Sequence, residues 1–160
     1  MTEKDYRGNV TAIIINKHKK VLMCEHIWID NAWQFPQGGI EPGESAEHAL
    51  YRELSEEIGT DKLIIIDKMD KPLKYHFPHY LKEKYNMEGN EQNFFLVYFY
   101  GDDSEIRFDN QPKPEFKSFK WVDYSMPAQE VIYFKKLSYH RALQYFYDVY
   151  EKLDVLSIKT

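Results

Sequence analysis

Apolar and polar residues alternate along this chain between short strand-like runs and two longer helix-like segments. Residues 10–16 and 21–26 are runs of β-branched or apolar side chains separated by the polar stretch NKHKK, which predicts a β-hairpin. Further strand-like runs occupy residues 63–67, 72–75, 93–101 and 118–122. These short runs predict a β-sheet.

The first helix is predicted over residues 46–58. Ser45 can cap its N terminus, Glu47 lies in the first turn where the helix dipole favours an anion, and Gly59 can end the helix. The apolar stripe of this helix consists of Leu50, Leu54 and Ile58.

The last helix begins near Lys136, and its apolar residues recur at steps of three and four positions. They are Tyr139, Ala142, Leu143, Phe146, Val149, Tyr150 and Leu153. Because such a face docks on a sheet, we expect a mixed sheet with helices on both faces. The polar residues 78–92 and 102–113 are predicted to be surface loops.

Length and composition predict one compact domain. The chain has 160 residues, of which 43% are apolar and 16% aromatic, enough for one sizeable core. We place the domain at residues 5–153 and a short tail at 154–160. The longest apolar run, residues 94–100, is far shorter than the roughly 20 residues that span a bilayer, and the polar start lacks the apolar part of a signal peptide. We therefore expect a cytoplasmic protein with no membrane partner.

The negative charge is concentrated in residues 38–60. This segment contains six glutamates and one arginine. Its charge of −5 equals the formal net charge of the whole chain. The rest of the chain is balanced, so it lacks the Lys/Arg excess with which proteins coat nucleic acids. We therefore expect no DNA partner.

Three of the six glutamates share one edge of the first predicted helix. Glu53, Glu56 and Glu57 cover an arc of about 100° beside the apolar stripe. Like charges at these spacings destabilise a helix, and residues 41–60 contain no lysine, which disfavours a solvated acidic face. Hard divalent cations bind carboxylate oxygens, and Mg²⁺ leaves further positions to water and substrate phosphates. The pattern therefore predicts a Mg²⁺ site that binds a polyphosphate.

The spacing of the residues around these glutamates resembles the Nudix box, which here spans residues 38–60. The matching positions are Gly38, Glu44, Arg52, Glu53, Leu54, Glu56, Glu57 and Gly59. One position departs, because Thr60 stands where the family usually has an aliphatic residue. The resemblance implies an α/β/α sandwich with a central mixed sheet, in agreement with the hydrophobic pattern. It also implies a phosphoanhydride hydrolase that acts on nucleoside diphosphate derivatives.

The resemblance extends over most of the chain to bacterial RNA 5′ pyrophosphohydrolases and dinucleoside polyphosphate hydrolases. The stretches YRGNV, WQFPQGGI, PEFKSFKWV and PAQEVIYFKK are similar to theirs, although Gly8 replaces their usual proline and HIWIDNA lacks an arginine often found there. The leading hypothesis is conversion of 5′-triphosphate or 5′-diphosphate RNA to 5′-monophosphate RNA, which initiates RNA decay. The alternatives are hydrolysis of diadenosine and other dinucleoside polyphosphates at the same site and, from another class, a non-catalytic nucleotide-binding regulator.

The resemblance also implies a metal centre with assigned residues. Glu53, Glu56 and Glu57 match the family's metal ligands and catalytic carboxylates, with Glu53 the first choice of general base and Glu57 the second. Glu115 matches a fourth carboxylate, and the glycine at Gly38 allows a main-chain carbonyl close to the ion. Two or three Mg²⁺ ions are expected, roughly 4 Å apart when they act as a pair, with Mn²⁺ as the alternative metal.

Other residues are expected to support this centre or to hold the substrate. Arg52 is implied to hold the glutamates by ion pairing, and Glu44 to order the loop. Arg7 and Phe134 match positions that clamp the first base of RNA, although the pattern alone also fits Phe134 as a core residue. The remaining substrate-binding candidates are Gln37, which either donates to phosphate or shapes the turn, Ile132 and Lys135. We expect a monomer that binds the 5′ end of single-stranded RNA or a small nucleotide polyphosphate.

Overall fold

One sheet forms the centre of the structure, which is a computed structural model describing residues 5–160. In this range the strands are β1 (Tyr6–Ile15), β2 (Val21–His26), β3 (Trp33–Gln34), β4 (Gln37–Gly39), β5 (Leu63–Lys68), β6 (Leu73–His76), β7 (Gly89–Phe99) and β8 (Phe116–Val122). The helices are α1 (Ala46–Ile58), α2 (His79–Tyr85), α3 (Pro127–Glu130) and α4 (Lys136–Lys152). Short 3-10 turns lie at Asp103–Glu105, Tyr133–Lys135 and Val155–Ser157.

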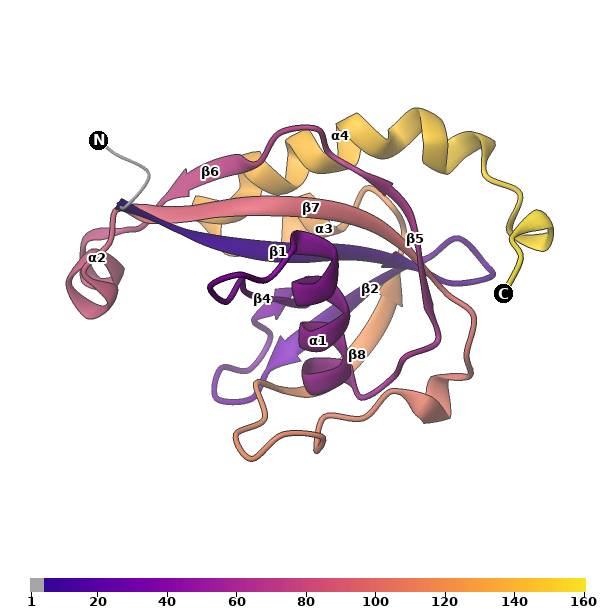
Figure 1. Cartoon of the computed structure of the whole chain (residues 1–160), viewed down its shortest axis with the longest axis horizontal. Coiled ribbons are helices and arrows are strands. Elements are labelled where there is room, and N and C mark those ends of the chain that lie inside the picture. Colours follow the sequence, from indigo (N-terminus) through magenta and orange to yellow (C-terminus); the bar gives the residue numbers. More distant parts are fainter. Residues whose placement is uncertain (1–4) are drawn as a thin grey trace.

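The sheet is mixed, as predicted. Its main order is β3-β2-β1-β7-β5, with β4 beside β1, β6 beside β7 and β8 beside β2. β1 and β7 run parallel along the whole of β1, whereas the other pairs among the described strands are antiparallel. Figure 1 shows these two long strands side by side through the middle of the molecule, with α1 in front of them and α4 behind.

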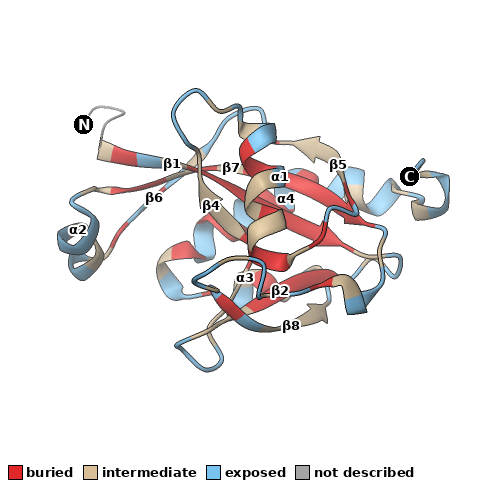
Figure 2. Ribbon diagram, turned by 60° about the horizontal axis from the view of Figure 1, so that its bottom comes forward, coloured by how far each residue is buried: buried red, intermediate tan, exposed pale blue. Residues whose placement is uncertain are grey.

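Both faces of the sheet are buried, which explains why its central strands are apolar at nearly every position. In β1, Val10, Ala12 and Ile14 pack on the α1 side, whereas Ile13 and Ile15 pack on the α4 side. Figure 2 shows the buried residues concentrated in the strands. The layers are therefore helix, sheet and helix, which confirms the predicted α/β/α sandwich.

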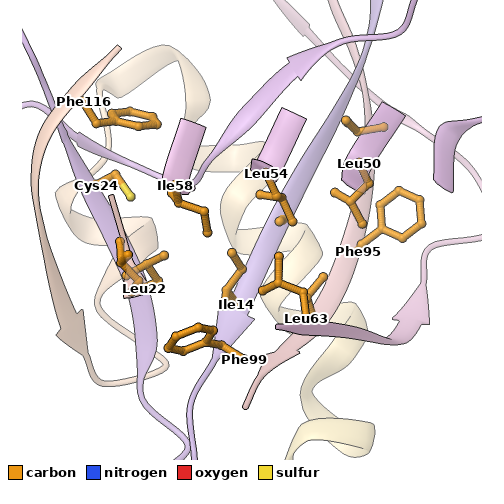
Figure 3. Close-up of a cluster of buried hydrophobic side chains, with 14 of the residues drawn as sticks. Ile14, Leu22, Cys24, Leu50, Leu54, Ile58, Leu63, Phe95, Phe99 and Phe116 are labelled. Atoms are coloured by element: carbon orange, nitrogen blue, oxygen red, sulfur yellow. The ribbon is translucent and has the colours of Figure 1, made fainter. Parts of the chain in front are cut away.

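α1 has the bounds and the caps predicted for it. The Ser45 Oγ accepts a hydrogen bond from the His48 N–H at 3.1 Å, and the Gly59 N–H donates to the Ser55 carbonyl. Its predicted apolar stripe lies in the buried cluster of Figure 3, against β1 and β7, and comprises Leu50, Leu54 and Ile58. This burial sets the rotation of the helix and therefore the direction in which its glutamates project.

α4 begins at Lys136, as predicted, and covers the other face of the sheet. Its buried residues are Ser138, Tyr139, Ala142, Leu143 and Phe146. The Tyr139 hydroxyl accepts a hydrogen bond from the Phe35 backbone N–H at 2.9 Å, which ties the helix to the segment before β4. The predicted apolar face was too wide, because Val149 is exposed. It lies at the edge of the helical arc, where the sheet no longer covers it.

The prediction that residues 78–92 form a loop was wrong. They contain α2 and the first residues of β7. Polar side chains hide the strand pattern there, yet Asn90 and Gln92 are buried and hydrogen-bonded. The Asn90 side chain contacts the Tyr75 hydroxyl at 2.6 Å, and the Gln92 side chain contacts the Thr11 hydroxyl at 3.1 Å. Cross-strand polar pairs replace the apolar contacts on which the prediction relied.

Smaller differences concern the ends of elements and two short strands. β1 begins four residues earlier than predicted, because its polar first residues pair with β7. β3 and β4 were not predicted, since strands of two and three residues form only by pairing with β2 and β1. The predicted tail, residues 154–160, contacts the α4 side of the core through Val155 and Ile158. No helix within residues 5–160 is long and apolar enough to cross a membrane.

Replacing Leu54 by alanine should destabilise the fold, because Leu54 is 1% exposed and its truncation leaves a cavity between α1 and the sheet. We expect the free energy of unfolding, measured by urea denaturation, to fall by about 2–5 kcal/mol. Tyr51→Ala is the matched control on the same helix, because Tyr51 is exposed and its loss should change the free energy by about 0.5 kcal/mol. Equal losses for the two variants would contradict this packing.

Candidate active site

The predicted glutamates project from α1 on the side that faces β4. β4 is held beside β1 by pairing of Val10 with Gly38. A Cβ atom at Gly38 would lie only 2.0 Å from Oε2 of Glu53. Glycine is therefore required at this position for the β4 backbone to lie against the Glu53 carboxyl group.

Glu57 is the most buried carboxylate of the cluster, with 2% of its surface exposed. Its Oε2 accepts a hydrogen bond from the Gln37 backbone N–H at 3.0 Å, whereas its Oε1 has no hydrogen-bond partner among the described residues. Burial raises the pKa of Glu57 well above its usual value, and the carboxylates of Glu115 and Glu53 raise it further. An ionised carboxylate in these surroundings requires a nearby positive charge.

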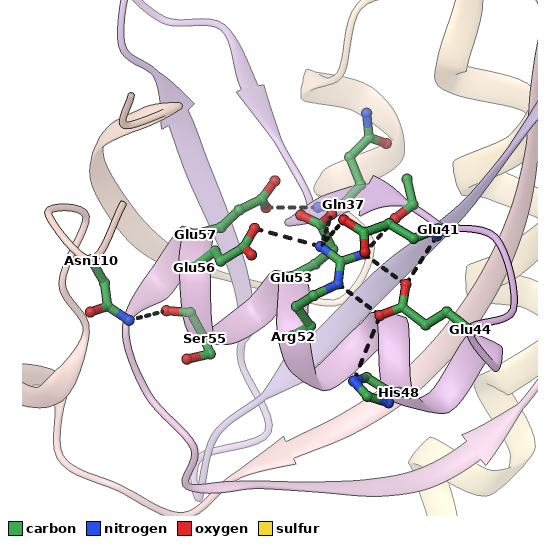
Figure 4. Close-up of polar contacts among 11 residues, drawn as sticks. Gln37, Glu41, Glu44, His48, Arg52, Glu53, Ser55, Glu56, Glu57 and Asn110 are labelled. Carbon is green, nitrogen blue, oxygen red and sulfur yellow. Dashed lines mark hydrogen bonds and ion pairs between the residues drawn. The ribbon is translucent and has the colours of Figure 1, made fainter. Parts of the chain in front are cut away.

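Glu53 and Glu56 share contacts with Arg52, toward which both carboxylates turn in Figure 4. Arg52 Nη1 lies 2.8 Å from Glu53 Oε1 and 3.6 Å from Glu56 Oε2. Burial nevertheless raises the pKa of Glu53, because it outweighs the opposing effect of Arg52. Arg52 therefore compensates only part of the negative charge at this edge of α1.

Arg52 also ties the loop before α1 to the helix. Its Nε and Nη2 donate to the two carboxylate oxygens of Glu44 at 2.7 and 2.8 Å, and Nη2 also donates to the Gly39 carbonyl at 2.8 Å. Glu44 in turn accepts a hydrogen bond from the Glu41 N–H at 3.0 Å. The bond from Arg52, followed by that from Glu41, lowers the pKa of Glu44 to about 2. A bidentate pair of this kind fixes both side chains in one geometry.

Glu115 comes to the cluster from the loop that precedes β8. Its carbonyl accepts a hydrogen bond from the Ile27 N–H at 2.8 Å, which joins this loop to the one after β2. Its carboxylate lies close enough to raise the pKa of both Glu53 and Glu57. The structure thus brings together three carboxylates, of which one is more than fifty residues distant in sequence.

Lys135 brings a buried ammonium group to the same surroundings. Its burial lowers the pKa to about 8, and the carboxylates of Glu57 and Glu115 oppose this shift. Lys135, a predicted substrate-binding residue, therefore also lies within the electrostatic range of the glutamates.

The glutamates form an oxygen-donor set that suits a hard divalent cation. No three Asp, Glu, His or Cys side chains within residues 5–160 form a ready-made ion cage, and Glu53 and Glu56 turn instead toward Arg52. The unpartnered Glu57 Oε1 and the raised pKa of Glu53 and Glu57 nevertheless indicate a shortage of positive charge. A bound divalent cation would supply this positive charge.

A cavity of about 680 Å³ joins the carboxylates to the predicted substrate-binding residues. The predicted site residues that line it are Arg7, Gln37, Gly38, Glu53, Glu115, Ile132, Phe134 and Lys135. Glu56 and Glu57 are not part of its lining, since Glu57 is buried and Glu56 pairs with Arg52. The cavity therefore connects a carboxylate end with a region of aromatic and cationic side chains.

Arg7 and Phe134, the predicted base clamp, both lie beside Tyr75. A Cβ atom at Gly39 would lie 2.6 Å from Arg7 Nη2, so the guanidinium lies against the β4 backbone. The charge of Arg7 acts on the Tyr75 hydroxyl, and the Tyr75 ring centroid is 5.8 Å from that of Phe134. Phe134 is half-buried and lines the cavity.

Several residues that line the cavity were not predicted. They include Trp28 and Ile29 from the loop after β2, and Tyr80, Leu81, Lys84 and Tyr85 from α2. Trp28 is 83% exposed, and its backbone N–H donates to His26 Nδ1 at 3.1 Å. The sequence signal was weak because α2 lies in a segment that reads as a polar loop. In the segment around Trp28, the one sequence signal was the lack of an arginine often found there in similar proteins.

Comparison with known families finds a NUDIX domain over residues 5–141. The chain belongs to the Nudix family. An RNA pyrophosphohydrolase of Campylobacter jejuni subsp. doylei is 40% identical over 150 residues, which cover 90% of this chain and 94% of that protein. An RNA pyrophosphohydrolase of Hydrogenovibrio crunogenus is 38% identical over 143 residues, which cover 86% of each. Nudix hydrolases generally use divalent metal ions, in agreement with the charge shortage at the glutamates.

Solved Nudix-like structures share the fold at low sequence identity. The E. coli dihydroneopterin triphosphate pyrophosphohydrolase has a TM-score of 0.64 at 21% identity, over 88% of this chain and 96% of that one. A C. elegans Ap4A hydrolase in a binary complex has a TM-score of 0.62 at 18% identity, over 88% of this chain and 98% of that one. The likeness confirms the Nudix fold.

Mg²⁺ should raise the melting temperature of this Nudix protein, and Glu57→Gln should remove most of the rise. A cation that binds only the folded state at about 100 times its Kd stabilises it by about 2.7 kcal/mol, which corresponds to several degrees. The measurement is calorimetry of chelator-treated protein with added Mg²⁺. Glu151→Gln, an exposed position on α4, is the matched control. An undiminished rise in Glu57→Gln would exclude Glu57 from the cation site.

Proposed function

We propose that this Nudix protein is a metal-dependent RNA pyrophosphohydrolase, which converts 5′-triphosphate or 5′-diphosphate RNA ends to 5′-monophosphate ends and so initiates RNA decay. The observation that carries this proposal is the single cavity that joins the glutamate cluster to Arg7 and Phe134. The relatives named RNA pyrophosphohydrolase support it, because they match over most of both chains.

The proposed metal ligands are the carboxylates of Glu53, Glu56, Glu57 and Glu115, with the Gly38 carbonyl. Two or three bound Mg²⁺ ions, or Mn²⁺ in their place, supply positive charge that neutralises the phosphate oxygens and lowers the pKa of the attacking water.

Glu53 is the proposed general base, with Glu57 as the second choice. The water oxygen forms a bond to phosphorus, the phosphoanhydride bond to the leaving phosphate breaks, and the water proton goes to the carboxylate. The raised pKa of Glu53 makes its carboxylate a stronger base than an exposed glutamate. Glu53 also lines the cavity, whereas Glu57 is buried away from it. The access to the cavity favours Glu53, whereas the pKa does not separate the two candidates, because that of Glu57 is raised further.

Supporting roles are proposed for Arg52, Glu44 and Gln37. The bidentate pair of Arg52 and Glu44 holds the loop before α1 in place. Gln37 donates its N–H to Glu57, and its side-chain oxygen lies 3.4 Å from the amide nitrogen of Gln92. These contacts favour the role of Gln37 in shaping the turn over donation to phosphate.

The first base of the RNA is proposed to stack between Arg7 and Phe134. Unpaired bases at RNA ends are commonly held between an aromatic ring and an arginine plane. Ile132, which is 47% exposed, offers an apolar contact at the rim, and Lys135 offers a hydrogen-bond donor. We propose that the enzyme acts in the cytoplasm as a monomer.

Hydrolysis of dinucleoside polyphosphates by the same carboxylates is the second candidate function. The exposed ring of Trp28 in the cavity favours it, because a dinucleotide carries a second base that needs a stacking surface. A non-catalytic nucleotide-binding role is a remote third candidate, which the complete glutamate set disfavours.

Competition between a short 5′-triphosphate RNA and diadenosine tetraphosphate in one tube with Mg²⁺ tests the proposal. We expect kcat/KM to favour RNA by at least about tenfold, because additional stacked bases contribute about 1–3 kcal/mol each. Glu57→Gln should lower both values by more than about 100-fold, since even residues that only support metal ligands cost 10- to 100-fold when replaced. Preference for diadenosine tetraphosphate would make small-nucleotide hydrolysis the function. Cleavage of neither substrate would favour the non-catalytic nucleotide-binding role.

Phe134→Ala and Arg7→Ala should each lower kcat/KM for RNA by about 5- to 100-fold, mainly by raising KM, because each removes one side of the base clamp. Tyr147→Ala is the control, since Tyr147 is an exposed aromatic residue of α4 outside the cavity lining. Steady-state kinetics on one RNA substrate provide the measurement. Unchanged kinetics in both clamp variants would exclude this mode of base recognition.

A further inference from the structure

The helix α2 (His79–Tyr85) forms a wall of the catalytic cavity at the end remote from the turn between β1 and β2. It connects β6 to β7 and projects from the end of the sheet, at the left of Figure 1. None of its residues is buried, and Figure 2 shows it as largely exposed. Tyr80, Leu81, Lys84 and Tyr85 nevertheless line the same cavity as Glu53 and Phe134. A helix so exposed contributes little to the core, so its aromatic side chains are available to a ligand.

A series of aromatic rings connects α2 to the base clamp. The ring centroid of Phe134 lies 5.8 Å from that of Tyr75, Tyr75 lies 5.9 Å from Phe77, and Phe77 lies 5.6 Å from Tyr85. The two middle rings are buried, whereas Tyr85 at the end is 47% exposed. Tyr80, also on α2, is 58% exposed. The packing therefore holds the exposed ring of Tyr85 at a defined distance from the clamp.

The charges in the cavity are distributed unevenly. Its carboxylate residues, Glu53 and Glu115, belong to the proposed metal centre, whereas its long cationic side chains are Arg7, Lys84, Lys113 and Lys135. Lys135 lies within electrostatic range of Glu57 and Glu115, whereas Lys84 comes from α2 and offers its charge to a phosphate backbone.

Lys84 is the cation that α2 offers to the cavity. Lys82 on the same helix pairs with Glu88 at 2.9 Å, and His79 lies 3.0 Å from Glu83. Lys84 forms no ion pair within residues 5–160, and its ammonium lies 5.3 Å from the ring centroid of Tyr85. A cation beside an exposed aromatic ring is the arrangement that binds single-stranded nucleic acid, because the ring stacks on a base and the cation contacts a phosphate.

We propose that α2 is a second RNA-binding subsite, which holds the nucleotides that follow the clamped 5′ end. Bases stack on Tyr80 and Tyr85, and a backbone phosphate contacts Lys84. This inference rests on the proposed RNA function and extends it from the 5′ terminus to the adjoining single strand. A dinucleoside polyphosphate has no such strand and gains nothing from α2.

The test compares 5′-triphosphate RNAs of two and eight nucleotides with diadenosine tetraphosphate as a third substrate. In the unaltered enzyme, kcat/KM should favour the octanucleotide over the dinucleotide by about 5- to 100-fold. Tyr85→Ala and Lys84→Ala should each remove most of this preference. Both variants should leave kcat/KM unchanged for the two-nucleotide RNA and for diadenosine tetraphosphate. The octanucleotide preference should also decline with added salt, and less steeply in Lys84→Ala.

Matched controls separate stacking from structural effects. Tyr85→Phe should retain the preference for the octanucleotide, because it keeps the ring. Lys17→Ala should also retain it, because Lys17 lies in the exposed turn between β1 and β2, far from α2 in Figure 1. Thermal unfolding should be nearly unchanged in Lys84→Ala, because Lys84 is exposed, and in Tyr85→Phe, which keeps the ring contact with Phe77.

The outcomes distinguish the two proposals. Failure to cleave either RNA while diadenosine tetraphosphate is hydrolysed would overturn the proposed RNA function. Cleavage of both RNAs with equal efficiency, or an octanucleotide preference that survives in both Tyr85→Ala and Lys84→Ala, would overturn the α2 subsite and leave the RNA function in place.

Discussion

The concentration of carboxylates beside α1 is the constraint on which the rest of this structure depends. Glu53, Glu57 and Glu115 converge in a partly buried region where the ionised form of a carboxyl group is disfavoured. Arg52 pairs with Glu53, and Lys135 lies within electrostatic range of the other two, yet the pKa values of Glu53 and Glu57 stay raised. A protein tolerates such a cluster only where its scaffold is rigid and a further positive charge can bind.

The scaffold meets this requirement through contacts on both sides of the glutamates. The apolar stripe of α1 is buried against the sheet and prevents rotation of the helix. On the polar side, Arg52 and Glu44 hold the preceding loop, and Gly38 lets β4 lie directly against Glu53. Local strand pairing and helix packing therefore set the positions of side chains that would otherwise repel one another.

The proposed function places catalysis at the carboxylate end of the cavity and substrate recognition in its aromatic and cationic part. Its carboxylate end holds the proposed metal ligands, and the fold around it is shared with structures at 18–21% identity whose names refer to other substrates. The fold by itself therefore does not define what is cleaved. The aromatic and cationic residues of β1, α2 and the segment before α4 form the part of the cavity in which specificity can differ.

Features that depend on neighbours in sequence could be predicted from the sequence alone. The bounds of α1, its caps and the common edge of Glu53, Glu56 and Glu57 follow from helical geometry, and the apolar runs indicated a sheet covered on both faces. The tertiary structure decided features that depend on distant segments. It buries Glu57 while the adjacent Glu56 stays accessible, brings Glu115 to α1, and turns a polar stretch into α2 and the start of β7. Local patterns do not encode these features, because long-range strand pairing and the packing of a helix against the sheet determine which distant side chains meet and which polar groups are satisfied.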